Sequence, residues 1–97
     1  TITNLWIGKN DLTDAAVQYI TKALATENHK LEYLDLTNCR RITDGCIDSI
    51  VDMVKTNRAM TEIDMHNCFL TNTGKEDLRR GVKAKYNFTI CVNSWNE

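Results

Sequence analysis

The sequence predicts an α/β stack of repeated units, with a parallel sheet on a concave side and helices on a convex side. Three copies of a nine-residue pattern begin at Ile2, Leu31 and Met60, each 29 residues after the one before, and a weaker fourth copy begins 28 residues later at Phe88. Each copy alternates apolar and polar residues, which indicates a strand, and apolar residues at helical spacing follow the first copies. Successive strands joined by helices are typical of parallel sheets, and one unit cannot bury its apolar face alone.

Each copy is predicted to form a short strand with one buried face. The fourth and sixth places of the first three copies carry the apolar pairs Leu5/Ile7, Leu34/Leu36 and Ile63/Met65. The residue between each pair therefore points to the opposite face. We expect strands near residues 3–7, 32–36, 61–65 and 89–92. An alignment of the fourth copy on Phe88 puts Cys91 at the fourth place and the polar Asn93 at the sixth, a departure from the pattern.

A threonine followed by Asp or Asn comes after each of the first three copies, as Thr13-Asp14, Thr43-Asp44 and Thr71-Asn72. The side-chain oxygens of these residues accept hydrogen bonds from the first N–H groups of a helix. We therefore expect helices near residues 13–27, 43–57 and 71–85. Asn28 and Asn57 close the first two helices, and the third has few apolar residues among many charged ones.

The ninth place of the copies carries Asn10, Cys39, Cys68 and Asn96. Backbone polar groups lose their ladder partners where the chain leaves a strand, and they must be satisfied inside the stack. Asparagine offers donors and acceptors for this purpose, and cysteine offers a small, weakly hydrogen-bonding side chain. We therefore predict a structural role at this place, with no metal or redox function for Cys39 and Cys68.

The whole chain resembles leucine-rich repeats of the ribonuclease-inhibitor type, and the stretch from Leu31 to Asp44 is closer to the cysteine-containing repeats of F-box proteins. Repeats of the first type also occur in NLR immune receptors and in cappers of the actin pointed end. The resemblance implies a leucine-rich-repeat solenoid of about three and a half repeats, near 2–30, 31–59 and 60–87, with a terminal strand in 88–97. We expect one domain over 1–97, a piece of a longer array, since no recognisable cap precedes Ile2.

Composition and motifs disfavour several other classes of function. The net charge of −1 disfavours nucleic-acid binding, and the chain carries no apolar run long enough to span a membrane. Asp64 and His66 share a face but supply only two ligands, and Cys68 is expected to point into the stack, so we expect no metal, no cofactor and no enzyme activity. The four cysteines lie at places expected to be buried or helical, without C-x-x-C spacing, which is typical of a reducing, cytoplasmic setting.

The outward places of the strands form the strongest candidate for a binding surface. The face carries acidic and aromatic residues with no Lys or Arg in the middle two copies, and we predict a protein-binding patch of Trp6, Tyr33, Asp35, Glu62, Asp64 and His66. Most basic residues fall in a turn or on the third helix, so this patch favours a basic protein partner. Two alternatives remain open. One is a purely architectural segment of a receptor, ubiquitin-ligase adaptor or cytoskeletal protein, and the other is a homo-oligomer formed through the uncapped first strand.

Overall fold

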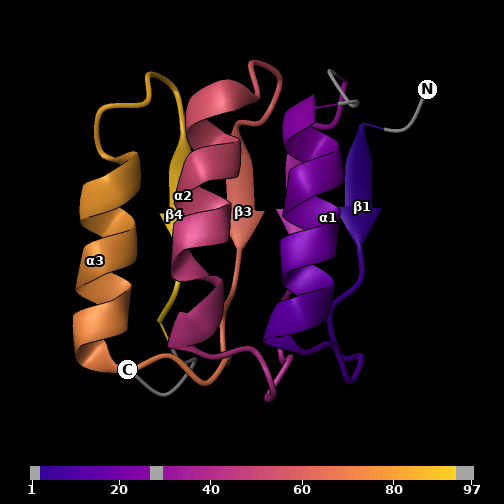
Figure 1. The fold of residues 1–97 in the computed structure, drawn as a ribbon, viewed down its shortest axis with the longest axis vertical. Coiled ribbons are helices and arrows are strands. Elements are labelled where there is room, and N and C mark those ends of the chain that lie inside the picture. The colour runs from indigo at the N-terminus through magenta and orange to yellow at the C-terminus, as the bar shows by residue number, and fades with distance from the viewer. Residues whose placement is uncertain (1–2, 27–29, 94–97) are drawn as a thin grey trace.

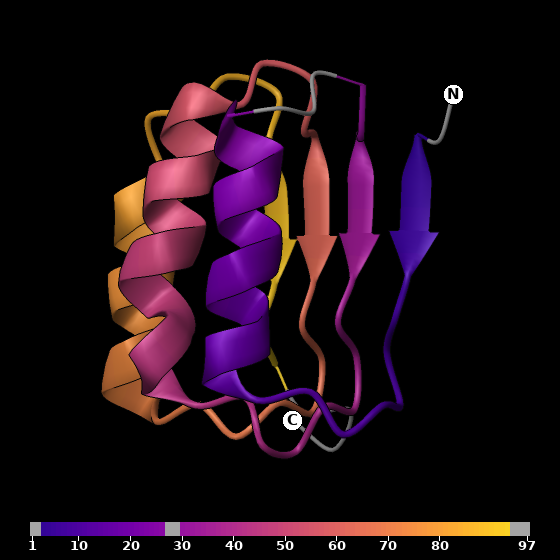
Figure 2. The ribbon, with the colours of Figure 1, turned by 45° about the vertical axis from the view of Figure 1, so that its right-hand side comes forward.

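A computed structural model describes residues 3–26 and 30–93, which form two layers, a parallel sheet and a row of helices (Figure 1). The strands pair in chain order and point the same way (Figure 2). The strands are β1 (Asn4–Trp6), β2 (Tyr33–Asp35), β3 (Glu62–Asp64) and β4 (Thr89–Cys91). The helices are α1 (Asp14–Thr26), a 3-10 turn η1 (Asp44–Cys46) leading into α2 (Ile47–Thr56), and α3 (Asn72–Val82). The mixed α/β class and the parallel sheet are confirmed.

The core lies between the sheet and the helices. Leu34, Leu36, Ile63 and Met65 are fully buried, as their alternation with polar residues predicts. They pack in one cluster with residues of the helices, Ile50 among them. Helix α3 ends three residues before its predicted end, because Lys83 and Lys85 donate to carbonyls three residues back in a tightened turn. The apolar face of that helix is correspondingly short.

Neighbouring units are joined by a side-chain bracket at the start of each helix. The Asp14 carboxylate accepts the backbone N–H of Thr43 at 2.7 Å and also its hydroxyl, and Asp44 makes the same pair of contacts with Thr71, at 3.0 Å to the backbone nitrogen. Each threonine in turn accepts from an N–H of its own first helical turn. The Thr-Asp pair thus caps its own helix and holds the next unit, a second role that sequence reasoning missed.

The contacts predicted for the ninth place with the strand ends are confirmed at Cys39 and Cys68. The Cys68 thiol donates to the Leu36 carbonyl at 3.1 Å, and the Cys39 thiol lies 3.8 Å from the Ile7 carbonyl. Each cysteine thus contacts the strand exit of the preceding unit. Asn10 is exposed and donates to Ile7 in its own unit, so it does not extend that series, and Asn96 lies outside the described residues.

The fourth strand corrects one prediction. β4 pairs Ile63 with Ile90 and Asp64 with Cys91, so it is shifted by one residue from the register predicted by the alignment on Phe88. Val92, which lies 27 residues after Met65, takes the corresponding core place and is buried, whereas Asn93 is exposed. The shift satisfies the sheet, because it puts an apolar side chain at both core places and moves Cys91 to the outer face, where it is only partly buried.

Candidate functional site

The open face of the sheet, which points away from the helices, brings the six predicted residues together. Trp6, Asp35 and Asp64 pair laterally across β1, β2 and β3, and Tyr33 pairs with Glu62 in the next row. His66 follows Asp64 by two residues and lies within ion-pair distance of it. The four described strands place no Lys or Arg on this face. The six residues, here called the open-face patch, form one surface, and their role in binding stays a prediction.

Two aromatic side chains form one end of the open-face patch. The rings of Trp6 and Tyr33 have centroids 6.0 Å apart and planes tilted by 59°, a favourable geometry for an aromatic pair. Trp6 remains 65% exposed, although indole rings are usually well buried. Burial raises the pKa of Tyr33 to about 12, together with the carboxylates of Asp35, Asp64 and Glu62. The phenol therefore stays protonated at neutral pH and can donate a hydrogen bond.

The two neighbouring aspartates have a local structural cause. One carboxylate oxygen of Asp35 accepts the Thr37 N–H at 2.8 Å and the Thr37 hydroxyl. Asp64 accepts the His66 N–H at 3.2 Å in the equivalent place. Each aspartate thus satisfies the backbone where its strand ends, which offsets the repulsion between like charges on adjacent strands. Acidity at these two positions is therefore not by itself evidence of a partner.

The structure adds Cys91 to this face. Its strand register puts it beside Asp64, and ligand atoms of Asp64, His66 and Cys91 all lie within 4.8 Å of one another. His66 Nδ1 is 2.5 Å from Asp64 Oδ1. Burial raises the pKa of the Cys91 thiol, with smaller contributions from Asp64 and Glu62. The sequence signal for this arrangement was the apolar pair Ile90 and Val92, 27 residues after Ile63 and Met65, which the alignment on Phe88 passed over.

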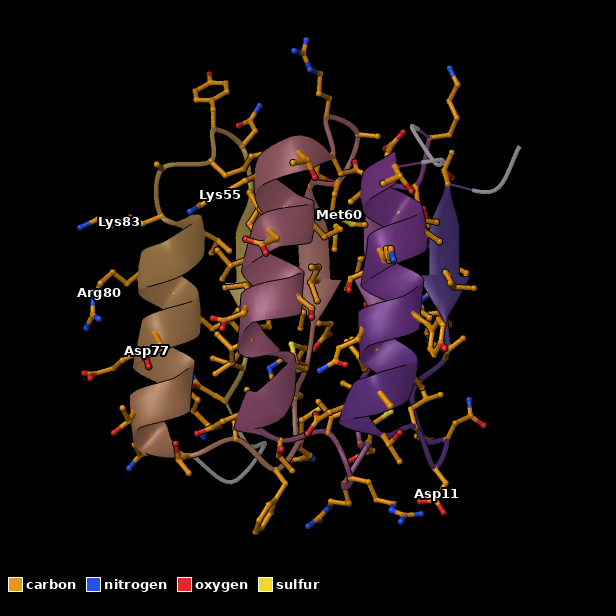
Figure 3. All side chains as sticks on the ribbon, in the orientation of Figure 1. Asp11, Lys55, Met60, Asp77, Arg80 and Lys83 are labelled. Atoms are coloured by element: carbon orange, nitrogen blue, oxygen red, sulfur yellow. The ribbon has the colours of Figure 1, made fainter. Side chains whose placement is uncertain are left out.

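Basic side chains lie away from the open face. Arg80 and Lys83 project outward from α3 and the turn after it, at the far edge of the helical layer (Figure 3). Arg79 donates to Asn93 at 2.6 Å, and Arg41 forms an exposed ion pair with Asp11 at 3.6 Å. These cations thus lie apart from the open-face patch, and Arg80 is paired with Asp77 of its own helix at 3.2 Å.

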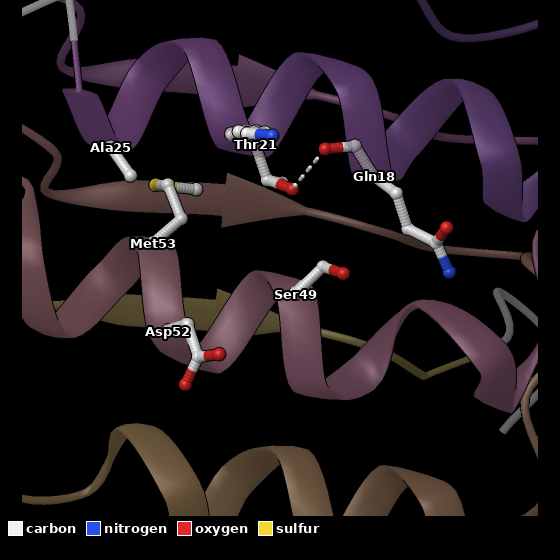
Figure 4. A pocket seen from close by; sticks show the side chains of 7 residues that line it. Gln18, Thr21, Ala25, Ser49, Asp52 and Met53 are labelled. Atoms are coloured by element: carbon white, nitrogen blue, oxygen red, sulfur yellow. Dashed lines mark hydrogen bonds between the residues drawn. The ribbon is translucent and has the colours of Figure 1, made fainter.

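A groove of about 340 Å³ between α1 and α2 is a second concave feature (Figure 4). The Thr21 hydroxyl on its wall donates back to the carbonyls of Val17 and Gln18 within α1. Ala25, Ser49, Asp52 and Met53 also line the groove. Gln18 on the same wall donates to the Gly45 carbonyl at 3.3 Å, so the polar groups of Gln18 and Thr21 are already engaged within the protein.

Comparisons with known proteins agree on the fold. No family profile matches the chain. The mouse (Mus musculus) NACHT, LRR and PYD domains-containing protein 3 is 30% identical over 81 residues, which cover 84% of this chain and 8% of that protein. The structure of leiomodin-1 actin-binding site 2 matches with a TM-score of 0.82 at 21% identity, over 98% of this chain and 55% of that one. The C-terminal domain of tropomodulin, from a Caenorhabditis elegans structural genomics study, matches with a TM-score of 0.78 at 14% identity, over 93% and 53%.

These comparisons bear on the fold. The chain spans about half the length of the two solved chains and a small part of the mouse protein. At these identities the solved structures show a shared architecture alone, because one fold can serve unrelated functions. Across residues 3–26 and 30–93, the structure contains no helix with the length and apolarity needed to cross a membrane.

Proposed function

We propose that this chain is a leucine-rich-repeat segment of the ribonuclease-inhibitor type, with one cysteine-containing repeat, that binds a protein partner through the open-face patch. The single observation that carries the proposal is the exposed Trp6–Tyr33 pair beside the acidic strand ends of β2 and β3. The fold shared with leiomodin-1 actin-binding site 2 supports an interaction role. A binding module of this kind needs no catalytic group, which fits the absence of a recognisable catalytic motif in the sequence.

The aromatic pair is suited to the centre of an interface. Binding energy concentrates in a few residues, and Trp and Tyr are enriched among them. Packing against Tyr33 limits the freedom of the Trp6 ring, so less side-chain entropy is lost when a partner covers it. An apolar or guanidinium group of the partner fits this surface, because an arginine can stack on the indole while it faces the carboxylates.

The partner that matches this surface is basic. Glu62 lies beside Tyr33, and Asp64 lies beside Asp35. The four described strands contain no Lys or Arg. Basic side chains such as Arg80 and Lys83 lie at the α3 edge of the helical layer, so positive charge is concentrated away from the open-face patch. Such a separation accelerates the approach of a basic partner and orients it toward the sheet, and salt weakens the effect.

Photocrosslinking at matched aromatic positions tests which face binds. Trp6 and Tyr19 are both exposed, at 65% and 80%, but Trp6 lies on the sheet and Tyr19 on α1. A photoreactive phenylalanine analogue is placed at one position at a time, and cross-linked proteins from a cytosolic extract are identified by mass spectrometry. We expect a discrete adduct from position 6, reduced by high salt and by Tyr33→Ala, and no such adduct from position 19.

The opposite pattern contradicts the proposal. A salt-resistant adduct from position 19 alone would move the binding surface to the helices. Discrete adducts from neither position would favour a segment that only spaces other domains. Circular dichroism and thermal unfolding of each labelled protein show whether the analogue has disturbed the fold.

Actin is a second, more specific candidate partner, because the chain shares its fold with actin-binding site 2 of leiomodin-1. Binding is measured by cosedimentation with filaments and by anisotropy with monomeric actin, with Trp6→Ala as the test variant and Tyr19→Ala as the matched control. Affinity lost in Trp6→Ala and kept in Tyr19→Ala supports the cytoskeletal version. The absence of binding to either form of actin excludes it and leaves the general proposal standing.

A further inference from the structure

Three side chains with different donor atoms meet on the open face between β3 and β4. Asp64 and Cys91 are lateral partners in the sheet, so their side chains leave the same face of strands that run about 4.8 Å apart. His66 lies two residues after Asp64 on the same face. The backbone register thus places Asp64 and Cys91 on one face, and the side-chain rotamers set how closely the ligand atoms of all three residues approach.

The donor set is a carboxylate oxygen, an imidazole nitrogen and a thiol sulfur, all within 4.8 Å of one another. We propose that Asp64, His66 and Cys91 bind a single zinc ion, with a fourth coordination position open to solvent. Mixed nitrogen, sulfur and oxygen donors favour zinc over magnesium or calcium, which prefer oxygen alone. Three protein ligands with one open position is the arrangement of accessible zinc sites. This inference does not depend on the proposed binding of a protein partner.

Only small movements are needed to coordinate the ion. Zinc bonds of about 2.0–2.3 Å place tetrahedral ligand atoms about 3.3–3.8 Å apart. The His66 Nδ1–Asp64 Oδ1 pair at 2.5 Å has to open by about 1 Å, whereas pairs toward the 4.8 Å limit have to close by a similar amount. All three side chains are partly exposed, so rotation about their χ angles supplies these shifts without disturbing the core. On binding, the Cys91 thiol releases its proton to solvent, and the thiolate and carboxylate balance the charge of the ion.

The rest of the chain contains natural controls. In the neighbouring unit, Asp35 occupies the place of Asp64, and Thr37 stands in place of His66. The lateral neighbour of Asp35 on the next strand is Asp64, whereas the lateral neighbour of Asp64 is Cys91. The other three cysteines, Cys39, Cys46 and Cys68, are buried in the core. A metal that required only surface acidity would bind both places, whereas the proposed zinc site exists at one.

Cobalt(II) alone serves as a spectroscopic probe for this site in the full chain. We expect one cobalt per chain, with a thiolate-to-cobalt charge-transfer band in the near ultraviolet and visible bands of tetrahedral intensity. Zinc should displace the cobalt. Cys91→Ser should abolish the thiolate band, and His66→Gln should weaken zinc binding by at least about tenfold. Asp35→Asn removes a neighbouring charge but no ligand, so it should keep the thiolate band and weaken zinc binding far less than His66→Gln.

A second readout uses the protection of Cys91 itself. Zinc should slow alkylation of Cys91, identified by mass spectrometry of its peptide, and His66→Gln should remove most of that protection. A thiolate band that persists in Cys91→Ser, or cobalt binding with no thiolate band in the natural sequence, overturns the proposal. Equal loss in Asp35→Asn and His66→Gln also overturns it, because it shows general electrostatic attraction. Circular dichroism spectra must match among the variants, and His66→Gln keeps the test valid if Cys91→Ser does not fold.

Discussion

The central strands β2 and β3 and the outer strands β1 and β4 carry equivalent side chains in different environments. Leu34 and Ile63, at the core place of the central strands, are fully buried. Leu5 and Ile90 occupy the same place in the outer strands and are only partly buried. The apolar pattern thus defines which face turns inward, whereas burial at this core place is deeper in strands with a neighbour on each side. Val92, at the next core place after β4, is nevertheless buried.

The largest expected effect is the loss of stability when a core side chain is truncated, and this loss should be larger in a central strand than in an outer one. Leu34→Ala removes a fully buried side chain and should lower the free energy of unfolding by about 2–5 kcal/mol, from lost burial and the cavity left behind. Leu5→Ala should cost less than about 2 kcal/mol, because its site is already partly hydrated. Urea unfolding, analysed with the same m-value for both variants, measures the two losses. Equal losses would show that β1 is as well packed as β2.

The next effect concerns the two Thr-Asp brackets. Asp14→Ala and Asp44→Ala each leave an N–H and a hydroxyl of the next unit without their acceptor, at a cost of about 1–3 kcal/mol. The Asp14 bracket is partly buried and the Asp44 bracket is exposed, so Asp14→Ala should cost more. Asp14→Asn keeps one acceptor oxygen and serves as the control. Thermal unfolding gives the order, and a larger loss at Asp44 would contradict this explanation.

A smaller, kinetic difference is expected among the cysteines. Cys91 is partly exposed, whereas Cys39, Cys46 and Cys68 are buried, so Cys91 should react first with iodoacetamide under native conditions. Its raised pKa means that the reactive thiolate is scarce at neutral pH, and the rate should continue to rise above the usual cysteine pKa. Peptide mass spectrometry over time gives the order in the metal-free protein. Prior labelling of Cys68 would mean that the β3 region opens before β4.

The smallest effect is expected from Asp35→Asn. The amide oxygen retains an acceptor for Thr37, and loss of the charge relieves repulsion with Asp64, so stability should change by less than about 0.5 kcal/mol. Unfolding at low and high salt separates the two contributions, because salt screens only the repulsion. A loss well above this range would show that the charged carboxylate itself is needed to hold the end of β2.

Alternation and spacing in the sequence determined the class of fold, the direction of the strands and the face on which each predicted patch residue lies. Those inferences succeeded for residues such as Leu34 and Asp35, because two-residue alternation sorts side chains to opposite faces. The threonines before each helix were equally legible, since capping involves near neighbours in the chain. Binding by the open-face patch remains a prediction.

Tertiary structure alone decided the features that depend on contacts between units. The bracket from Asp14 to Thr43 joins residues 29 positions apart, so no local pattern reveals it. The register of β4 depended on which pairing fills the core, Ile90 and Val92 or Cys91 and Asn93, and burial of the apolar pair outweighed the match of Phe88 to the repeat. That shift of one residue moved Cys91 from the predicted core to the face that holds Asp64 and His66, because neighbouring positions on a strand point to opposite sides of the sheet.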